Sequence, residues 1–314
     1  DVGRLLEVAD ADPETLVVVM SDHGFGPVHS FFLLNNWLVE QGLLRFKGGL
    51  RTGLKRLLFR LGFTPLRSFR ITKAVGLGRL RKKVRFQQKA GLVNKVFLSF
   101  DDVDWARTRA FGIGSFGQIY VNLAGAYPQG CVQPGREYED LKDEIARQAL
   151  ALRDPRTGQP LVDRVYRREE IYRGRYLERT PDLIVQPRGW EYMAFGHADF
   201  GSHRLVEPIA GLSGHHRLEG LVILAGGGVR PGAELQGASI LDVAPTILHA
   251  LDVAVPEEMD GRVLQEAFEA SSPLARPVRS SPASVYKDGA AAPGLAEEEM
   301  DEVQEKLRGW GYAG

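Results

Sequence analysis

The sequence predicts an α/β protein in which helices cover both faces of a mostly parallel sheet. Short apolar runs rich in β-branched residues, each ended by polar residues or glycine, are typical of buried parallel strands. Segments with apolar residues at helical spacing lie between these runs, and this alternation is typical of parallel α/β sheets. The 314 residues are enough to bury a sizeable core.

The elements are predicted in chain order from these patterns. Residues 2–8 carry apolar side chains at helical spacing, so the chain opens inside a helix. The first residues, 1–6, contain neither an initiator Met nor a signal-peptide pattern, and we expect the polypeptide to be cut from something longer. The predicted strands are 16–20, 118–121, 182–185 and 220–225, and the predicted helices are 138–152 and 242–251. His249, within the last helix, is interpreted as a core or surface histidine whose ring nitrogens have partners.

Composition narrows the class of protein. Forty basic and forty acidic residues cancel, so the molecule has no bulk field that would attract nucleic acid or membrane. Cys131 is the single cysteine, which excludes an intramolecular disulfide framework and a cysteine-rich zinc module, so a metal would be held by His and carboxylate. No apolar run approaches the ~20 residues that span a bilayer. We expect a cytoplasmic location.

A local charge imbalance marks one segment. Between Glu40 and Asp101 there is no acidic residue, whereas residues 41–100 contain sixteen Lys and Arg. Apolar positions within it predict short basic amphipathic helices broken by Gly62, Pro65 and Gly76. Three interpretations stay open: a cap over an active site, which we favour, then a surface that contacts anionic lipid, and last a nucleic-acid surface, because aromatic stacking groups are not interleaved.

Two short motifs carry the candidate chemistry. Asp22 and His23 follow the first predicted strand in Ser21-Asp22-His23-Gly24, and a carboxylate beside an imidazole is a ligand pair that zinc accepts. A hydrogen-bonded loop pair is the alternative interpretation. The second motif, Gly214-His215-His216-Arg217, comes just before the predicted strand 220–225.

Taken together in chain order, these motifs resemble the type I phosphodiesterase and nucleotide pyrophosphatase family of the alkaline phosphatase superfamily. The stretches that match are 17–26, 180–185, 214–220 and 242–248, with Met259-Asp260-Gly261. The resemblance implies an alkaline-phosphatase-like three-layer sandwich that is incomplete at the N-terminus. It also implies a small phosphate-ester substrate and two divalent metal ions, usually zinc.

The resemblance assigns roles residue by residue. It makes Asp22 and His23 ligands of one metal and His216 a ligand of the other. His215 and Arg217, beside His216, become candidates for contacts to substrate or to the metal ligands. His197 is a further candidate for a substrate contact on a different ground, because Trp190, Tyr192 and Phe195 make its neighbourhood aromatic; an exposed aromatic loop is the alternative. The family's Thr or Ser nucleophile, a further Asp ligand and an Asp-x-x-x-His pair precede the Ser-Asp-His-Gly motif. The nucleophile is therefore expected outside this chain, and the chain alone is expected to be inactive.

The predicted function is metal-dependent hydrolysis of phosphodiester or pyrophosphate bonds by a two-metal mechanism. The alternative is a non-catalytic truncated or interaction module that associates with membranes through residues 41–100. Four segments are predicted: 1–46, part of the metal-binding core; 47–100, the basic helical insertion; 101–270, the remainder of the core; and 271–314, a Ser/Pro/Ala-rich connection with a C-terminal helix.

Overall fold

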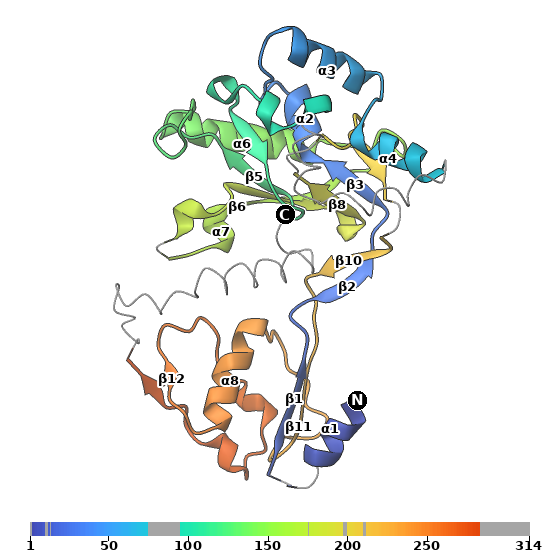
Figure 1. Cartoon of the computed structure of the whole chain (residues 1–314). Coiled ribbons are helices and arrows are strands. Elements are labelled where there is room, and N and C mark those ends of the chain that lie inside the picture. Colours follow the sequence, from blue (N-terminus) through green and yellow to red (C-terminus); the bar gives the residue numbers. More distant parts are fainter. Residues whose placement is uncertain are drawn as a thin grey trace, which may run out of the picture. The chain divides into compact units, whose positions relative to one another are not determined.

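The computed structural model describes residues 2–9, 12, 14–74, 95–174, 176–196, 200–209 and 212–282. Contacts divide the chain into two compact units (Figure 1). Unit 1 comprises Asp1–Asp22 and Gly220–Gly314, and unit 2 comprises His23–Glu219. Both contain helices and strands, so the protein is mixed α/β. The four segments predicted from the sequence stay a prediction.

Unit 2 contains a short ladder and two sheets. The ladder pairs β2 (Gly24–Pro27) with β10 (Gly214–Arg217) in antiparallel fashion. In the three-stranded sheet, β3 (Ser30–Leu33) lies between β8 (Tyr192–Phe195), which is parallel to it, and β9 (Val206–Pro208), which is antiparallel. The four-stranded antiparallel sheet has the order β4 (Ala110–Gly112), β5 (Gln118–Val121), β7 (Leu183–Pro187) and β6 (Val162–Arg167).

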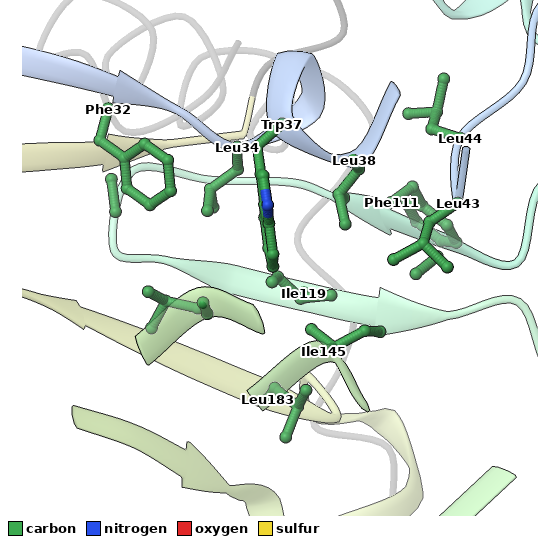
Figure 2. Close-up of a cluster of buried hydrophobic side chains, with 14 of the residues drawn as sticks. Phe32, Leu34, Trp37, Leu38, Leu43, Leu44, Phe111, Ile119, Ile145 and Leu183 are labelled. Carbon is green, nitrogen blue, oxygen red and sulfur yellow. The ribbon is translucent and has the colours of Figure 1, made fainter. Parts of the chain in front are cut away.

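The core of unit 2 forms between the four-stranded sheet and two helices. Helix α6 (Arg136–Leu150) contacts β6 and β7, and it buries Leu141, Ile145 and Ala149, the face predicted from their spacing. Helix α2 (Leu34–Glu40) contacts β4 and β8. Figure 2 shows Trp37 reaching from α2 toward Ile119 of β5.

The other helices of unit 2 include the basic segment. They are α3 (Leu50–Arg60), α4 (Pro65–Ala74), α7 (Arg168–Ile171) and the 3-10 turns η2 (Phe100–Asp102), η3 (Trp105–Arg107), η4 (Leu177–Arg179) and η5 (Arg188–Trp190). The predicted break between the basic helices is confirmed: Gly62 has a positive φ of 85° and Pro65 opens α4. Gly76 lies outside the described residues.

Unit 1 contains the two-stranded ladder of β1 (Leu16–Met20) and β11 (Val222–Gly226), and a parallel pair of β12 (Val255–Pro256) and β13 (Ser280–Ser281). Its helices are α1 (Val2–Ala9), α8 (Val243–Ala250) and the 3-10 turns η6 (Ile240–Asp242), η7 (Gln265–Ala267) and η8 (Pro273–Ala275). His249 is buried, and its Nε2 lies 2.8 Å from the carbonyl oxygen of Leu274, which confirms the interpretation of a satisfied histidine. The helix predicted at the C-terminus lies outside the described residues.

The direction of strand pairing departs from the prediction. Within the described part of the chain, only β3 with β8 and β12 with β13 pair in parallel, so a mostly parallel central sheet is not confirmed. The strand at 16–20 exists, but its predicted parallel pairing and burial are wrong, because it pairs antiparallel with β11 and is half-exposed. A run of apolar residues indicates that a strand tends to be buried, but it does not indicate whether the neighbouring strand is parallel or antiparallel. For β4 and β5, the connection 113–117 is too short for a parallel crossover.

Among the residues that the structure describes, no helix is both long enough and apolar enough to cross a membrane.

Candidate metal-binding site

The β2–β10 ladder brings the two predicted motifs together. Its register places His216 opposite Phe25 and Arg217 opposite Gly24, so His23, which directly precedes β2, lies beside His216. His23 Nε2 and His216 Nδ1 are 2.6 Å apart although the residues are separated by 193 positions. The ring centroids are 3.9 Å apart with an interplanar angle of 71°. The structure therefore joins one histidine from each motif.

The backbone selects the tautomer of His23. Its Nδ1 lies 2.7 Å from the carbonyl oxygen of Gly24. A carbonyl oxygen can only accept, so Nδ1 carries the hydrogen and the Nε2 of the neutral ring keeps its lone pair. That lone pair is directed at His216 Nδ1, which then donates to it. A backbone acceptor that orients an imidazole in this way is typical of metal-ligating histidines.

Glycines in both motifs permit this approach. A Cβ on Gly24 would lie 2.0 Å from the carbonyl oxygen of Glu219, a contact with backbone that cannot simply rotate away. A Cβ on Gly214 would lie 2.2 Å from the ring of Phe25. Close packing of β2 against the segment that follows β10 therefore requires Gly24, whereas a side chain at position 214 would have to displace the ring of Phe25.

Aromatic side chains line the histidine pair. The ring of Phe116 lies 5.1 Å from that of His215 and 5.7 Å from that of His216, and the ring of Phe25 lies 6.4 Å from that of His216. His215 is buried, and burial, followed by the neighbouring His216, lowers the pKa of its imidazole. Phe25 and Phe116 were not predicted as site residues. Tertiary structure brings Phe116 to the histidines, and the nearby glycines Gly114 and Gly117, which adopt positive φ, were the signal of a turn in the sequence but not of this contact.

Arg217 takes part in the ladder itself. Its guanidinium donates to the carbonyl oxygen of His216 at 3.1 Å and to that of Pro27 on the partner strand. These bonds tie β10 to β2 next to the histidine pair. A contact between Arg217 and substrate stays a prediction.

The donor types fit part of a metal site. Two imidazoles from strand ends are suitable zinc ligands. Asp22 is exposed and ends unit 1, whereas His23 begins unit 2, so Asp22 is described with its own unit. His197 lies outside the described residues. No group of three or more His, Cys, Asp or Glu suited to hold a metal ion occurs among the residues that the structure describes.

Comparisons with known proteins bear on the same motifs. The model of the family described as type I phosphodiesterase / nucleotide pyrophosphatase matches residues 1–204. The matched range contains Asp22 and His23 and ends before His216. No curated protein matches the chain. No solved structure matches it either.

Proposed function

Because the chain belongs to the type I phosphodiesterase / nucleotide pyrophosphatase family, we propose that it is the part of a phosphodiester or pyrophosphate hydrolase that supplies metal ligands. Family membership supports phosphoester hydrolysis as the class of reaction, and the family is generally dependent on divalent metals. The proposed ligands are Asp22, His23 and His216, with two zinc ions as the metals. No nucleophile is assigned within residues 1–314.

One observation carries the proposal: His23 and His216, from two motifs far apart in the chain, meet at 2.6 Å. The carbonyl oxygen of Gly24 accepts the hydrogen on Nδ1 of His23 in the same structure. That carbonyl keeps Nε2 available as an electron-pair donor, which is what metal coordination needs.

Bound metal ions in such a site acidify an attacking hydroxyl and neutralise charge on the phosphoryl group. The residues of this chain have complementary roles in the proposal. Gly24 holds the proton on Nδ1 of His23 through its carbonyl oxygen. Phe116 and Phe25 pack beside the ring of His216. Arg217 keeps β10 in register with β2.

The proposal extends to the fold. We place the chain in an alkaline-phosphatase-like three-layer sandwich, and its mixed α/β character supports this. A solved structure of the full-length protein in which helices did not cover both faces of a central sheet would contradict it.

The test compares two adjacent histidines in the full-length protein. After removal of metal by a chelator, zinc is titrated back into the wild type, His216→Ala and His215→Ala, and bound zinc is measured by metal analysis. Altering groups that only orient a ligand costs about 10–100-fold in affinity, so loss of the ligand His216 should cost at least that much. His215→Ala should cost clearly less, because its ring packs on Phe116.

Hydrolysis of an aryl phosphodiester is measured on the same samples. We expect zinc-dependent hydrolysis by the wild type that falls in parallel with zinc occupancy in His216→Ala. Equal loss of zinc in both variants would show that the register is wrong. If the wild type bound no metal when zinc was supplied in excess and cleaved no phosphodiester, monoester or sulfate ester, the enzyme proposal would be abandoned in favour of the non-catalytic interaction module.

A further inference from the structure

Helix α3 presents its apolar side chains to solvent. Leu50, Leu54, Leu57 and Leu61 are 95, 58, 54 and 70% exposed. Their spacing of four, three and four residues aligns them on one face of the helix and its C-cap. This leucine stripe, defined by these four residues, is the reverse of the usual arrangement, in which the apolar face of a surface helix packs on the core.

The opposite face of α3 is attached to unit 2 by polar contacts. Lys55 is buried, and its Nζ lies 2.7 and 3.0 Å from the two carboxylate oxygens of buried Asp102. Thr52 is buried on the same face, and the ring of Phe59 packs edge-on against that of Phe200 at 6.1 Å. Turning the leucine stripe inward would leave a buried carboxylate without its cation, which is strongly destabilising. The outward orientation of the stripe is therefore determined by the structure.

Basic side chains flank the leucine stripe. Arg51 lies on one side of it, Arg56 and Arg60 lie on the other, and all three are exposed. No acidic residue occurs between Glu40 and Asp101, so nothing within the segment neutralises them. An exposed apolar stripe with arginines on both flanks is the pattern of a helix that lies in the interface of an anionic membrane.

The place and length of α3 agree with an interfacial role. At 11 residues it is about 16 Å long, too short to span a bilayer, but it can lie along its surface. In Figure 1, α3 lies at the end of unit 2 away from β2 and β10, so it does not cover the histidine pair. A second copy of the chain is a poorer binding partner for the leucine stripe than a membrane, because it would bring an equally basic segment against the first. Nucleic acid would leave the leucine stripe in water.

We propose that α3 docks unit 2 on the surface of a membrane that contains anionic phospholipid. The leucine stripe inserts between the headgroups, and Arg51, Arg56 and Arg60 lie at the level of the lipid phosphates. Lys55 is held on Asp102 and takes no part in lipid contact.

The test is co-sedimentation of the full chain with vesicles of phosphatidylcholine alone and of phosphatidylcholine mixed with phosphatidylserine. The wild type should bind the mixed vesicles and bind the neutral ones far less. Leu54→Gln/Leu57→Gln should weaken partitioning to mixed vesicles by roughly tenfold or more, because two half-exposed leucines no longer transfer out of water. Arg56→Glu/Arg60→Glu should weaken it at least as much, since each basic residue near an anionic surface contributes about fivefold.

The matched control is Leu150→Gln/Leu251→Gln, which removes two leucines that are 49 and 68% exposed elsewhere in the chain. It should partition as the wild type does. Unchanged binding of the leucine-stripe variant, or an equal loss in the control, would overturn the proposal. So would failure of the wild type to bind mixed vesicles. A dimer in analytical ultracentrifugation that the leucine-stripe variant dissolved, without vesicle binding, would identify a second copy as the occupant instead.

Discussion

The buried pair of Lys55 and Asp102 determines how α3 faces the rest of unit 2, and its removal gives a quantitative prediction. Asp102 accepts hydrogen bonds from Lys55 Nζ at 2.7 and 3.0 Å, from the backbone N–H of Ser99 at 3.2 Å and from the hydroxyl of Thr52 at 3.4 Å. Lys55→Met keeps most of the side-chain volume but removes the cation. The carboxylate is then left buried with neutral donors only.

The expected cost follows from this geometry. Removing one partner of a buried ion pair destabilises a protein by about 3–5 kcal/mol. Asp102→Asn added to Lys55→Met removes the stranded charge while its amide oxygen can still accept from Ser99, so the double variant should be more stable than Lys55→Met. The control is Arg164→Met, which breaks the exposed pair with Glu170 and should cost no more than about 1 kcal/mol.

Native-state hydrogen exchange is the suitable assay, because a chain with two compact units need not unfold in one step. The free energy of opening is read from amides of residues 50–60, which report local detachment of α3. Lys55→Met should lower this free energy of opening by about 3–5 kcal/mol. The double variant Lys55→Met/Asp102→Asn should recover part of that loss. Protection of α3 in Lys55→Met equal to that in Arg164→Met would refute the reasoning.

Two further predictions concern the scaffold of unit 2. Gly24→Ala places a Cβ 2.0 Å from the carbonyl oxygen of Glu219, so it should separate β2 from the segment after β10. The variant should bind zinc more weakly in titration and lose about 1–3 kcal/mol of stability against thermal unfolding. Unaltered zinc affinity would contradict this. Burial alone would raise the pKa of the Asp154 carboxyl, but hydrogen bonds from Arg156 and Tyr192 prevail and hold it below its ordinary value of 3.8. A depressed folded-state pKa contributes stability that is complete above the unfolded value and lost as the pH falls through the folded one. The thermal midpoint should therefore fall less below pH 4 in Asp154→Asn than in the wild type; parallel curves would be evidence against the pKa shift.

The element types were readable where the pattern was long or strongly apolar. The strands β1, β5, β7 and β11 and the helix α6 all fall on their predicted segments. These patterns are local, because the alternation or spacing of apolar residues depends only on the backbone of the same element. The ladder β2–β10 was missed, since Gly24–Pro27 has no strand pattern and is held as a strand by its partner.

The candidate site was partly readable. Asp22, His23 and His216 were selected by motif and resemblance, and the family is confirmed. The contact between His23 and His216 could not be predicted from spacing, because 193 residues separate them and only the ladder register joins them. Phe116 was overlooked for the same reason: its closeness to the histidines depends on the loop between β4 and β5.

The sequence by itself determined the helices and strands with long or strongly apolar patterns, which family the chain resembles and that residues 41–100 carry no acidic group. Tertiary structure decided the direction of the strands, the pairing of the two histidine motifs and the face that α3 turns outward. The apolar face of a surface helix usually packs on the core. In α3 this orientation is reversed, because Lys55 pairs with the buried carboxylate of Asp102, far along the chain. Leaving that carboxylate without its cation would destabilise the protein more than leaving four leucines exposed.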